Sequence, residues 1–315
     1  MPALLTHNYF GTDVLARLGE ELFPAHDDKA FAEELRRIFL LGNQGPDPFF
    51  FALRTPHLVA SKRFGSRMHR ERNGETIEAL RRLVACLSEP TGSLLTAYLF
   101  GFLCHFTLDS TVHPFVYAQQ HALCDAGVKG LDRRDGSIVH GQIEADLDMM
   151  MLFQRRGVSI RSYDYTRSVL KLSDKSLALL DVMYQALAHE VYAADLPHDA
   201  FSRGVKDMRL TISVLYSPRG IKRRVFGNLE RLFRRHSLAQ AMSPRADVGT
   251  TCDFDNHACD AWINPFTDAV SHASFAELYA EALEAACANI VALRDGEPVA
   301  TITRGLDFEG AVARA

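Results

Sequence analysis

Three ionisable residues lie four positions apart at the end of an apolar segment, in the sequence CHFTLDSTVHPF at residues 104–115. They are His105, Asp109 and His113, and residues four apart share one face of an α-helix. A buried charge destabilises an apolar helix unless a partner or a metal compensates it. Imidazole nitrogens and carboxylate oxygens are ligands that suit zinc, so the spacing indicates a metal site on this face.

A second pair, His140 and Glu144, repeats the four-residue spacing. Two histidine–carboxylate pairs on neighbouring helices can converge on one pocket. Two other interpretations stay open. One is a core histidine hydrogen-bonded to the backbone, and the other is a buried salt-bridge network between carboxylates and charged histidines. The five residues taken together favour the metal site.

Helical periodicity dominates the sequence, and convincing strands are scarce. Pro114 is expected to end the helix that carries His105, and Ser137 is expected to cap the next one. A capping box at Ser274 and Glu277 predicts a late helix, and the tail after Gly296 is expected to be frayed. The other predicted helices span residues 31–41, 75–87, 94–109, 139–154, 173–193, 199–216 and 219–236.

The fold class predicted from these helices is all-α, a multi-helix bundle around a clustered metal site. The sequence shows no internal repeat and no clear interdomain linker. We therefore predict a single domain over residues 1–315, with a metal-binding core at about 4–150 and additional helices at about 163–295.

The composition is typical of a soluble globular protein, with 315 residues, 47% hydrophobic and 23% charged. A net charge of −4 argues against a general nucleic-acid binder. The cysteines are scattered, without a C-x-x-C pair, which favours a reducing compartment. The N-terminal sequence lacks the basic region of a signal peptide, and the longest apolar run, 94–108, is short for a transmembrane helix. We expect a cytoplasmic protein.

Several stretches together resemble the zinc-dependent phospholipase C family, which is related in fold to fungal single-strand nucleases. These are LLTHNYFG with His7, LGNQGPDPFFF with Asp47, GSRMHRE with His69, HFTLDSTVHPF with the first histidine–aspartate pair, and HGQIEADLD with the second pair. Each motif alone is common, but their order along residues 4–150 is specific. The short gap between Asp109 and His113 is most similar to the N-terminal domain of glycosylphosphatidylinositol-specific phospholipase D.

The resemblance implies an all-α phosphoesterase with two or three zinc ions. One ion would be held by Asp47, His69, His105 and Asp109. A second would be held by His113, His140 and Glu144, with a position left open for water. His7 and Asp109 would hold the third, and Asp47 is the implied general base. Because zinc lowers the pKa of bound water to about 7, the implied reaction is hydrolysis of a phosphodiester, and the implied substrate class includes phospholipids.

Three alternatives stay open at this point. The chain could be a nuclease-like phosphoesterase acting on small nucleotides, or a metal-stabilised binding or structural protein without turnover. It could also hold iron or manganese, because oxygen and nitrogen ligands accept these metals too. Turnover of a chromogenic phosphodiester would separate an enzyme from a binding protein.

Other charged positions carry weaker predictions. Asp148 follows Glu144 by four residues and is either a hydrogen-bond partner of the site or a solvated carboxylate. Asp253 and His257 are expected to hydrogen-bond each other in a loop. Arg219–Arg235 contains seven basic residues around an apolar stripe, a pattern of helices that contact anionic membranes. An ordinary surface helix packed by its apolar face is the competing interpretation.

Overall fold

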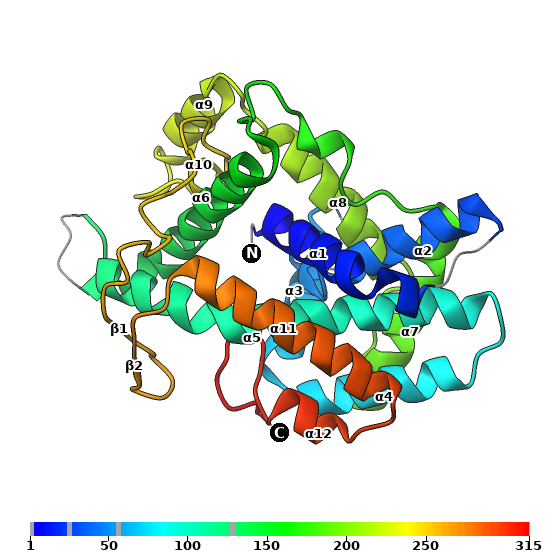
Figure 1. The fold of residues 1–315 in the computed structure, drawn as a ribbon. Coiled ribbons are helices and arrows are strands. Elements are labelled where there is room, and N and C mark those ends of the chain that lie inside the picture. Colours follow the sequence, from blue (N-terminus) through cyan, green and yellow to red (C-terminus); the bar gives the residue numbers. More distant parts are fainter. Residues whose placement is uncertain (1–2, 24–26, 55–57, 126–129, 315) are drawn as a thin grey trace. The chain divides into compact units, whose positions relative to one another are not determined.

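The protein is described by a computed structural model over residues 3–23, 27–54, 58–125 and 130–314. Within these residues the regular secondary structure is helical apart from one short antiparallel hairpin (Figure 1). The predicted all-α fold class is therefore confirmed. The α-helices are α1 (Leu4–Leu22), α2 (Lys29–Gly42), α3 (Leu58–Arg70), α4 (Asn73–Ala85), α5 (Thr91–Asp125), α6 (Gly136–Arg156), α7 (Asp174–Tyr192), α8 (Ala200–Leu215), α9 (Ile221–Glu230), α10 (Leu238–Ala241), α11 (Phe275–Arg294) and α12 (Val299–Thr303).

Short elements complete the described structure. The 3₁₀ turns are η1 (Asp47–Phe51), η2 (Arg133–Asp135) and η3 (Tyr165–Arg167), and the hairpin pairs β1 (Trp262–Ile263) with β2 (Val270–Ser271). As predicted, Ser274 and Glu277 form a capping box at the start of α11, with Glu277 accepting the Ser274 N–H at 2.8 Å.

Contacts divide the chain into two compact units. The first unit comprises residues 1–9, 112–169 and 211–280, and the second comprises 10–111, 170–210 and 281–315. The helices α1, α5, α8 and α11 contribute residues to both units. The expectation of a single domain stays a prediction.

The long helix α5 continues beyond Pro114 to Asp125, so the expectation that the proline ends it was wrong. Proline inside a helix costs about 3 kcal/mol. The flanking side chains of Val112, Phe115 and Val116 are each at most 7% exposed, and their burial offsets this cost.

Among the described residues, α5 is the one helix long and apolar enough to cross a bilayer. Of its most apolar window, 78% is buried within the protein. The core helix of a globular fold has the same length and composition, so this finding is weak evidence for a membrane span.

In the second unit, α2 packs closely against α5. A Cβ added to Gly101 of α5 would collide with the carbonyl oxygen of Phe39 on α2, so a residue without a side chain is needed there. The turn after α2 then runs along α5 and brings the carbonyl of Asn43 to the ring of His105.

The C-terminal segment belongs to the second unit and is ordered, so the expectation of a frayed tail after Gly296 was wrong. It forms α12 and then a turn that buries Phe308 completely. Its end is held by backbone hydrogen bonds, since the Arg314 N–H donates to Arg70 and the Arg72 N–H donates to Arg314. An apolar side chain near the terminus thus anchors the tail in the core.

In the first unit, α6 begins one residue before the expected cap. Asp132 and Asp135 form a capping box over η2, and α6 follows directly at Gly136. Ser137 therefore lies inside the helix, and its predicted capping role was wrong. The start of α1 is fixed within the first unit as well. Asp148 of α6 accepts the N–H groups of Leu5 and Thr6 at 3.0 and 2.8 Å, which caps the first turn of α1.

Candidate metal centres

The first group of candidate ligands lies within the second unit and consists of Asp47, His69 and His105. One ligand atom from each lies within 4.8 Å of the others. Asp47 begins η1, His69 lies at the end of α3, and His105 lies in the middle of α5. The His69 Nε2 is 3.1 Å from the Asp47 Oδ1. Three residues from separate parts of the sequence thus converge.

Both histidines of this group are oriented by the backbone. The Nδ1 of His69 lies 2.8 Å from the carbonyl oxygen of Gly65, and the Nδ1 of His105 lies 3.1 Å from that of Asn43. A carbonyl oxygen only accepts, so each Nδ1 carries a proton and donates it. This leaves Nε2 as the atom turned toward the group, the arrangement that fixes metal-binding imidazoles.

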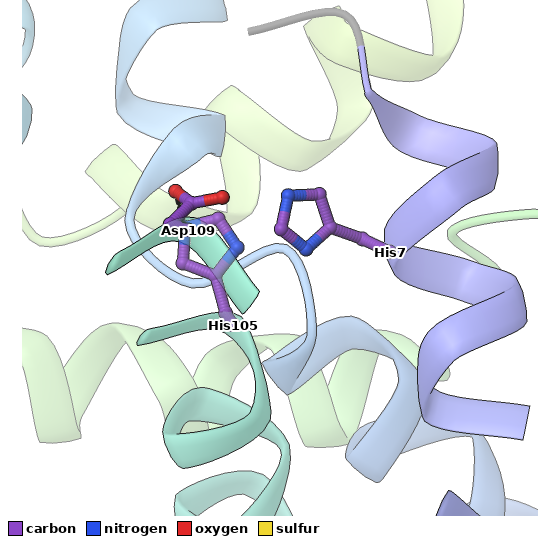
Figure 2. A group of neighbouring side chains, drawn as sticks. All are labelled: His7, His105 and Asp109. Carbon is purple, nitrogen blue, oxygen red and sulfur yellow. Dashed lines mark ion pairs between the residues drawn. The ribbon is translucent and has the colours of Figure 1, made fainter. Parts of the chain in front are cut away.

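Asp109 lies one turn beyond His105 on the same helix. Its Oδ2 is 3.3 Å from the His105 Nε2, and Figure 2 shows the two side chains next to each other on α5. The carboxylate is 5% exposed. Asp109, the predicted fourth ligand of this group, therefore lies beside His105, and the two would bind the same metal ion.

Two features that the sequence did not predict shape this group. Gly45 has φ of +48°, and a Cβ there would collide with the ring of His105. Phe308 packs against both rings, with centroid distances of 5.1 Å to His69 and 5.3 Å to His105, and its N–H donates to the His69 carbonyl. The Gly/Pro-rich sequence around Gly45 is a pattern from which a tight turn there could have been predicted. No sequence pattern indicates that Phe308 packs on the two rings.

Asp47 and His69 shift each other's pKa. Burial by itself would raise the pKa of Asp47, but the hydrogen bond from His69 and the nearby His105 lower it below its ordinary value. Burial would lower the pKa of His69, yet the hydrogen bond and charge of Asp47 raise it. The Asp47 carboxylate is therefore ionised at neutral pH. Its negative charge stabilises either a protonated His69 ring or a metal cation beside it.

The second group lies within the first unit and consists of His113, His140 and Glu144, again with ligand atoms within 4.8 Å. The Glu144 Oε1 is 3.5 Å from the His113 Nε2 and 3.3 Å from the His140 Nε2. The Nδ1 of His140 donates to the side-chain oxygen of Gln120 at 3.1 Å. The ring of Tyr117 packs on His140 at 4.9 Å. One carboxylate oxygen and two imidazole nitrogens therefore face one another.

Burial also sets the protonation of this group. It lowers the pKa of His140, against the opposing effect of Glu144, so this ring is neutral at pH 7 and its Nε2 can donate a lone pair. Burial would raise the pKa of Glu144, but the hydrogen bonds from the His113 and His140 rings hold it well below its ordinary value. Neutral imidazole and ionised carboxylate are the forms that bind zinc.

His7 lies in the first unit near the start of α1 and is 3% exposed (Figure 2). The cap that Asp148 places on Leu5 and Thr6 holds this turn of the helix, so Asp148 acts on α1 rather than on Glu144. The third ion predicted between His7 and Asp109 stays a prediction, because these two residues belong to different units.

The loop that follows α10 contains charged residues outside both groups. His257 is hydrogen-bonded to Asp255 at 2.7 Å, so the expected pair with Asp253 was wrong. Asp253 lies with His121 and Trp262 at a cavity of ≈ 580 Å³ in the first unit.

The donor atoms of the two groups fit zinc. Each group offers imidazole nitrogen and carboxylate oxygen, which are common zinc ligands, and the three protein ligands of the second group would leave one position for water. His69, His105 and His140 also have the outer hydrogen bond that a metal-bound imidazole needs.

The chain matches a known protein family. A family model described as zinc-dependent phospholipase C matches residues 6–194, more than half of the chain, and this region includes every candidate ligand. No curated protein and no solved structure is matched. The chain therefore belongs to the zinc-dependent phospholipase C family, whose members are metal-dependent hydrolases of phospholipids.

Proposed function

We propose that this protein is a zinc-dependent phosphodiesterase that hydrolyses a phospholipid by attack of water on phosphorus. One observation carries the proposal. The matched family region brings together two histidine–carboxylate groups, Asp47–His69–His105 and His113–His140–Glu144, each with its ligand atoms within 4.8 Å. Structural stability alone does not require two such groups in one chain.

Each group would hold one zinc ion, with Asp109 as a further ligand of the first. Zinc would supply a Lewis acid for the phosphate oxygens and would lower the pKa of a bound water. The protein would supply orientation, because the hydrogen bonds at Nδ1 of His69, His105 and His140 fix the rings before the metal arrives. His7 and Asp109 would hold a third ion.

Asp47 is the residue that we propose as the proton acceptor. Its pKa lies below the ordinary value, so it is ionised at neutral pH, and it is 6% exposed, which limits competition from bulk water. A low pKa makes a carboxylate a weak base, so its charge and its hold on His69 would contribute alongside proton transfer.

The test is hydrolysis of a soluble diester, bis(p-nitrophenyl) phosphate, beside hydrolysis of phospholipid vesicles. Both activities should be lost on chelation and restored by zinc. His140→Ala should abolish them while the circular dichroism spectrum stays helical, because one ligand is lost from a large core. His198→Ala is the matched control, since that side chain is 89% exposed, and it should keep full activity.

Two results would contradict the proposal. If chelation lowers the melting temperature but no diester is turned over, the metals are structural. If small nucleotide diesters are cleaved and phospholipids are not, the protein is a nuclease-like phosphoesterase. The cytoplasmic location expected from the sequence stays a prediction.

A further inference from the structure

The segment around α9, in the first unit, exposes five large apolar side chains. We call these residues the α9 surface: Ile221 (62% exposed), Val225 (48%), Leu229 (55%), Leu232 (73%) and Phe233 (88%). Single exposed apolar residues are ordinary, but five within 13 positions form a patch of the kind that marks an interaction site.

Helix geometry places three of these side chains on one side of α9, and Leu232 and Phe233 lie in the turn that follows the helix. Ile221, Val225 and Leu229 follow one another at four-residue spacing and so share a face of α9. The opposite face is attached to the rest of the unit, where Gly227 is buried and Arg223 donates to the backbone oxygen of Gln240 at 3.1 Å. The competing interpretation from the sequence, a helix packed by its apolar face, was therefore wrong.

The segment that carries the apolar stripe is basic, although Arg223 lies on the packed face and Arg235 pairs with Asp132 at 3.1 Å. The segment contains seven basic residues: Arg219, Lys222, Arg223, Arg224, Arg231, Arg234 and Arg235. Its one acid, Glu230, points back into the fold, where it accepts from the Ser237 hydroxyl at 2.6 Å and the Ala239 N–H at 2.9 Å. The basic residues thus dominate the charge of this segment, although the whole chain has a net charge of −4.

We infer that the α9 surface docks on an anionic lipid surface. Apolar side chains on one face of a helix can enter the boundary between head groups and acyl chains, while flanking Arg and Lys contact the anionic head groups. A nucleic acid would engage the basic residues but would leave the apolar stripe in water. A second copy of this surface would oppose like charges, which disfavours self-association. The inference is independent of the metal groups.

The first experiment is co-sedimentation of the full chain with vesicles. One set contains phosphatidylglycerol and phosphatidylcholine, and the other contains phosphatidylcholine alone. Chelator is present in one arm, so that cleavage of the lipid does not obscure binding. We expect binding to the anionic vesicles only, weaker at high salt because salt screens exposed charges, and unchanged by chelation.

Variants separate the two parts of the surface. Leu232→Asp combined with Phe233→Asp should weaken vesicle binding at least tenfold. Val59→Asp combined with Val182→Asp is the matched control, since these residues are 79% and 65% exposed elsewhere in the chain.

The contribution of charge has its own pair of variants. Arg224→Gln combined with Arg234→Gln should flatten the salt dependence, whereas Arg36→Gln combined with Lys171→Gln should not. All four double variants should hydrolyse bis(p-nitrophenyl) phosphate as the natural chain does.

Several outcomes would overturn the inference: no sedimentation with anionic vesicles at low salt, equal binding by the apolar variant and its control, or an α9 surface that binds nucleic acid or a second copy instead. Failure of the proposed enzymatic function is a separate result, since it would show as absent diester hydrolysis with vesicle binding intact.

Discussion

Histidine orientation is the feature that prepares both candidate sites at the level of single residues. In His69, His105 and His140 the Nδ1 donates to a fixed oxygen of the protein, and Nε2 is left facing the group. A ligand that is already oriented loses little freedom when the metal binds, so the free energy of binding is not consumed by ordering the site. Residues that hold the rings in place therefore matter as much as the ligands.

Gly45 is one such residue, and its replacement gives the first prediction. Gly45→Ala places a Cβ against the His105 ring at a backbone φ of +48°, so the ring must move. We expect a loss of about 1–3 kcal/mol in the free energy of unfolding and a lower zinc content. Denaturant unfolding and elemental analysis measure these quantities.

The control is Gly157→Ala, which also has a positive φ, of +65°, but has no atom within 4 Å of the added Cβ. This variant should lose only the free energy of unfolding that the strained backbone costs, and its zinc content should be unchanged. Equal zinc content in the two variants would contradict the role given to Gly45.

At the level of secondary-structure elements, side chains from segments distant in the sequence hold the candidate ligands in place. The C-terminal turn after α12 places Phe308 on His69 and His105, and α6 places Asp148 on the first turn of α1. Neither contact comes from local periodicity, and each can be tested separately.

The second prediction concerns the C-terminal turn. Phe308→Ala should lower the free energy of unfolding by about 3–5 kcal/mol, because a fully buried aromatic ring is lost and a cavity opens beside two candidate ligands. Phe233→Ala, which removes a ring that is 88% exposed, should change stability by less than about 0.5 kcal/mol. Similar unfolding midpoints for the two variants would show that the tail does not support the core.

The third prediction concerns the cap on α1. Burial raises the pKa of Asp148 to about 7, although the N–H groups of Leu5 and Thr6 oppose the shift. The folded chain then keeps this proton between about pH 4 and 7 while the unfolded chain has lost it. A raised carboxyl pKa therefore makes folding less favourable as pH rises through this window, by up to about 4 kcal/mol.

The side chain of Asp148→Asn cannot ionise. From pH 4 to 7, the free energy of unfolding of the natural chain should therefore fall relative to that of this variant. The difference between the two should be constant above pH 8. Urea unfolding at several pH values, with chelator present in every sample, measures it. A difference that does not vary with pH would contradict the raised pKa.

On the scale of the whole molecule, the two groups of ligands belong to different compact units, yet α5 contributes to both. The second unit provides Asp47, His69 and His105, whereas the first provides His113, His140 and Glu144. Two metal sites with different surroundings should differ in their sensitivity to acid, which is the basis of the fourth prediction.

Zinc must displace any proton on its ligands, so affinity falls when a ligand protonates. Asp47 raises the pKa of His69, whereas burial lowers the pKa of His140. The group in the second unit should therefore release zinc at a higher pH. His140→Ala retains that group and His69→Ala retains the other, so equilibrium dialysis of both variants from pH 8 to 5 tests the order. Coincident or reversed release curves would contradict it.

The sequence by itself determined the features that depend on residues close along the chain. The four-residue spacing of His105 with Asp109 and of His140 with Glu144 follows from helix geometry alone, and both pairs lie within ion-pair distance in the structure. The capping box at Ser274 is local as well. The order of the motifs along the chain predicted the family, and helical periodicity predicted the all-α fold.

Only the tertiary structure decided which distant segments meet. Asp148 caps Thr6 from 142 positions away, Phe308 covers the ring of His69, and α5 continues through Pro114 because its neighbours are buried. The exposure of Phe233 was likewise undecided, since an apolar stripe predicts either a buried face or a docking face. Such outcomes depend on the sum of packing and desolvation over residues far apart in sequence, and no local period encodes that sum.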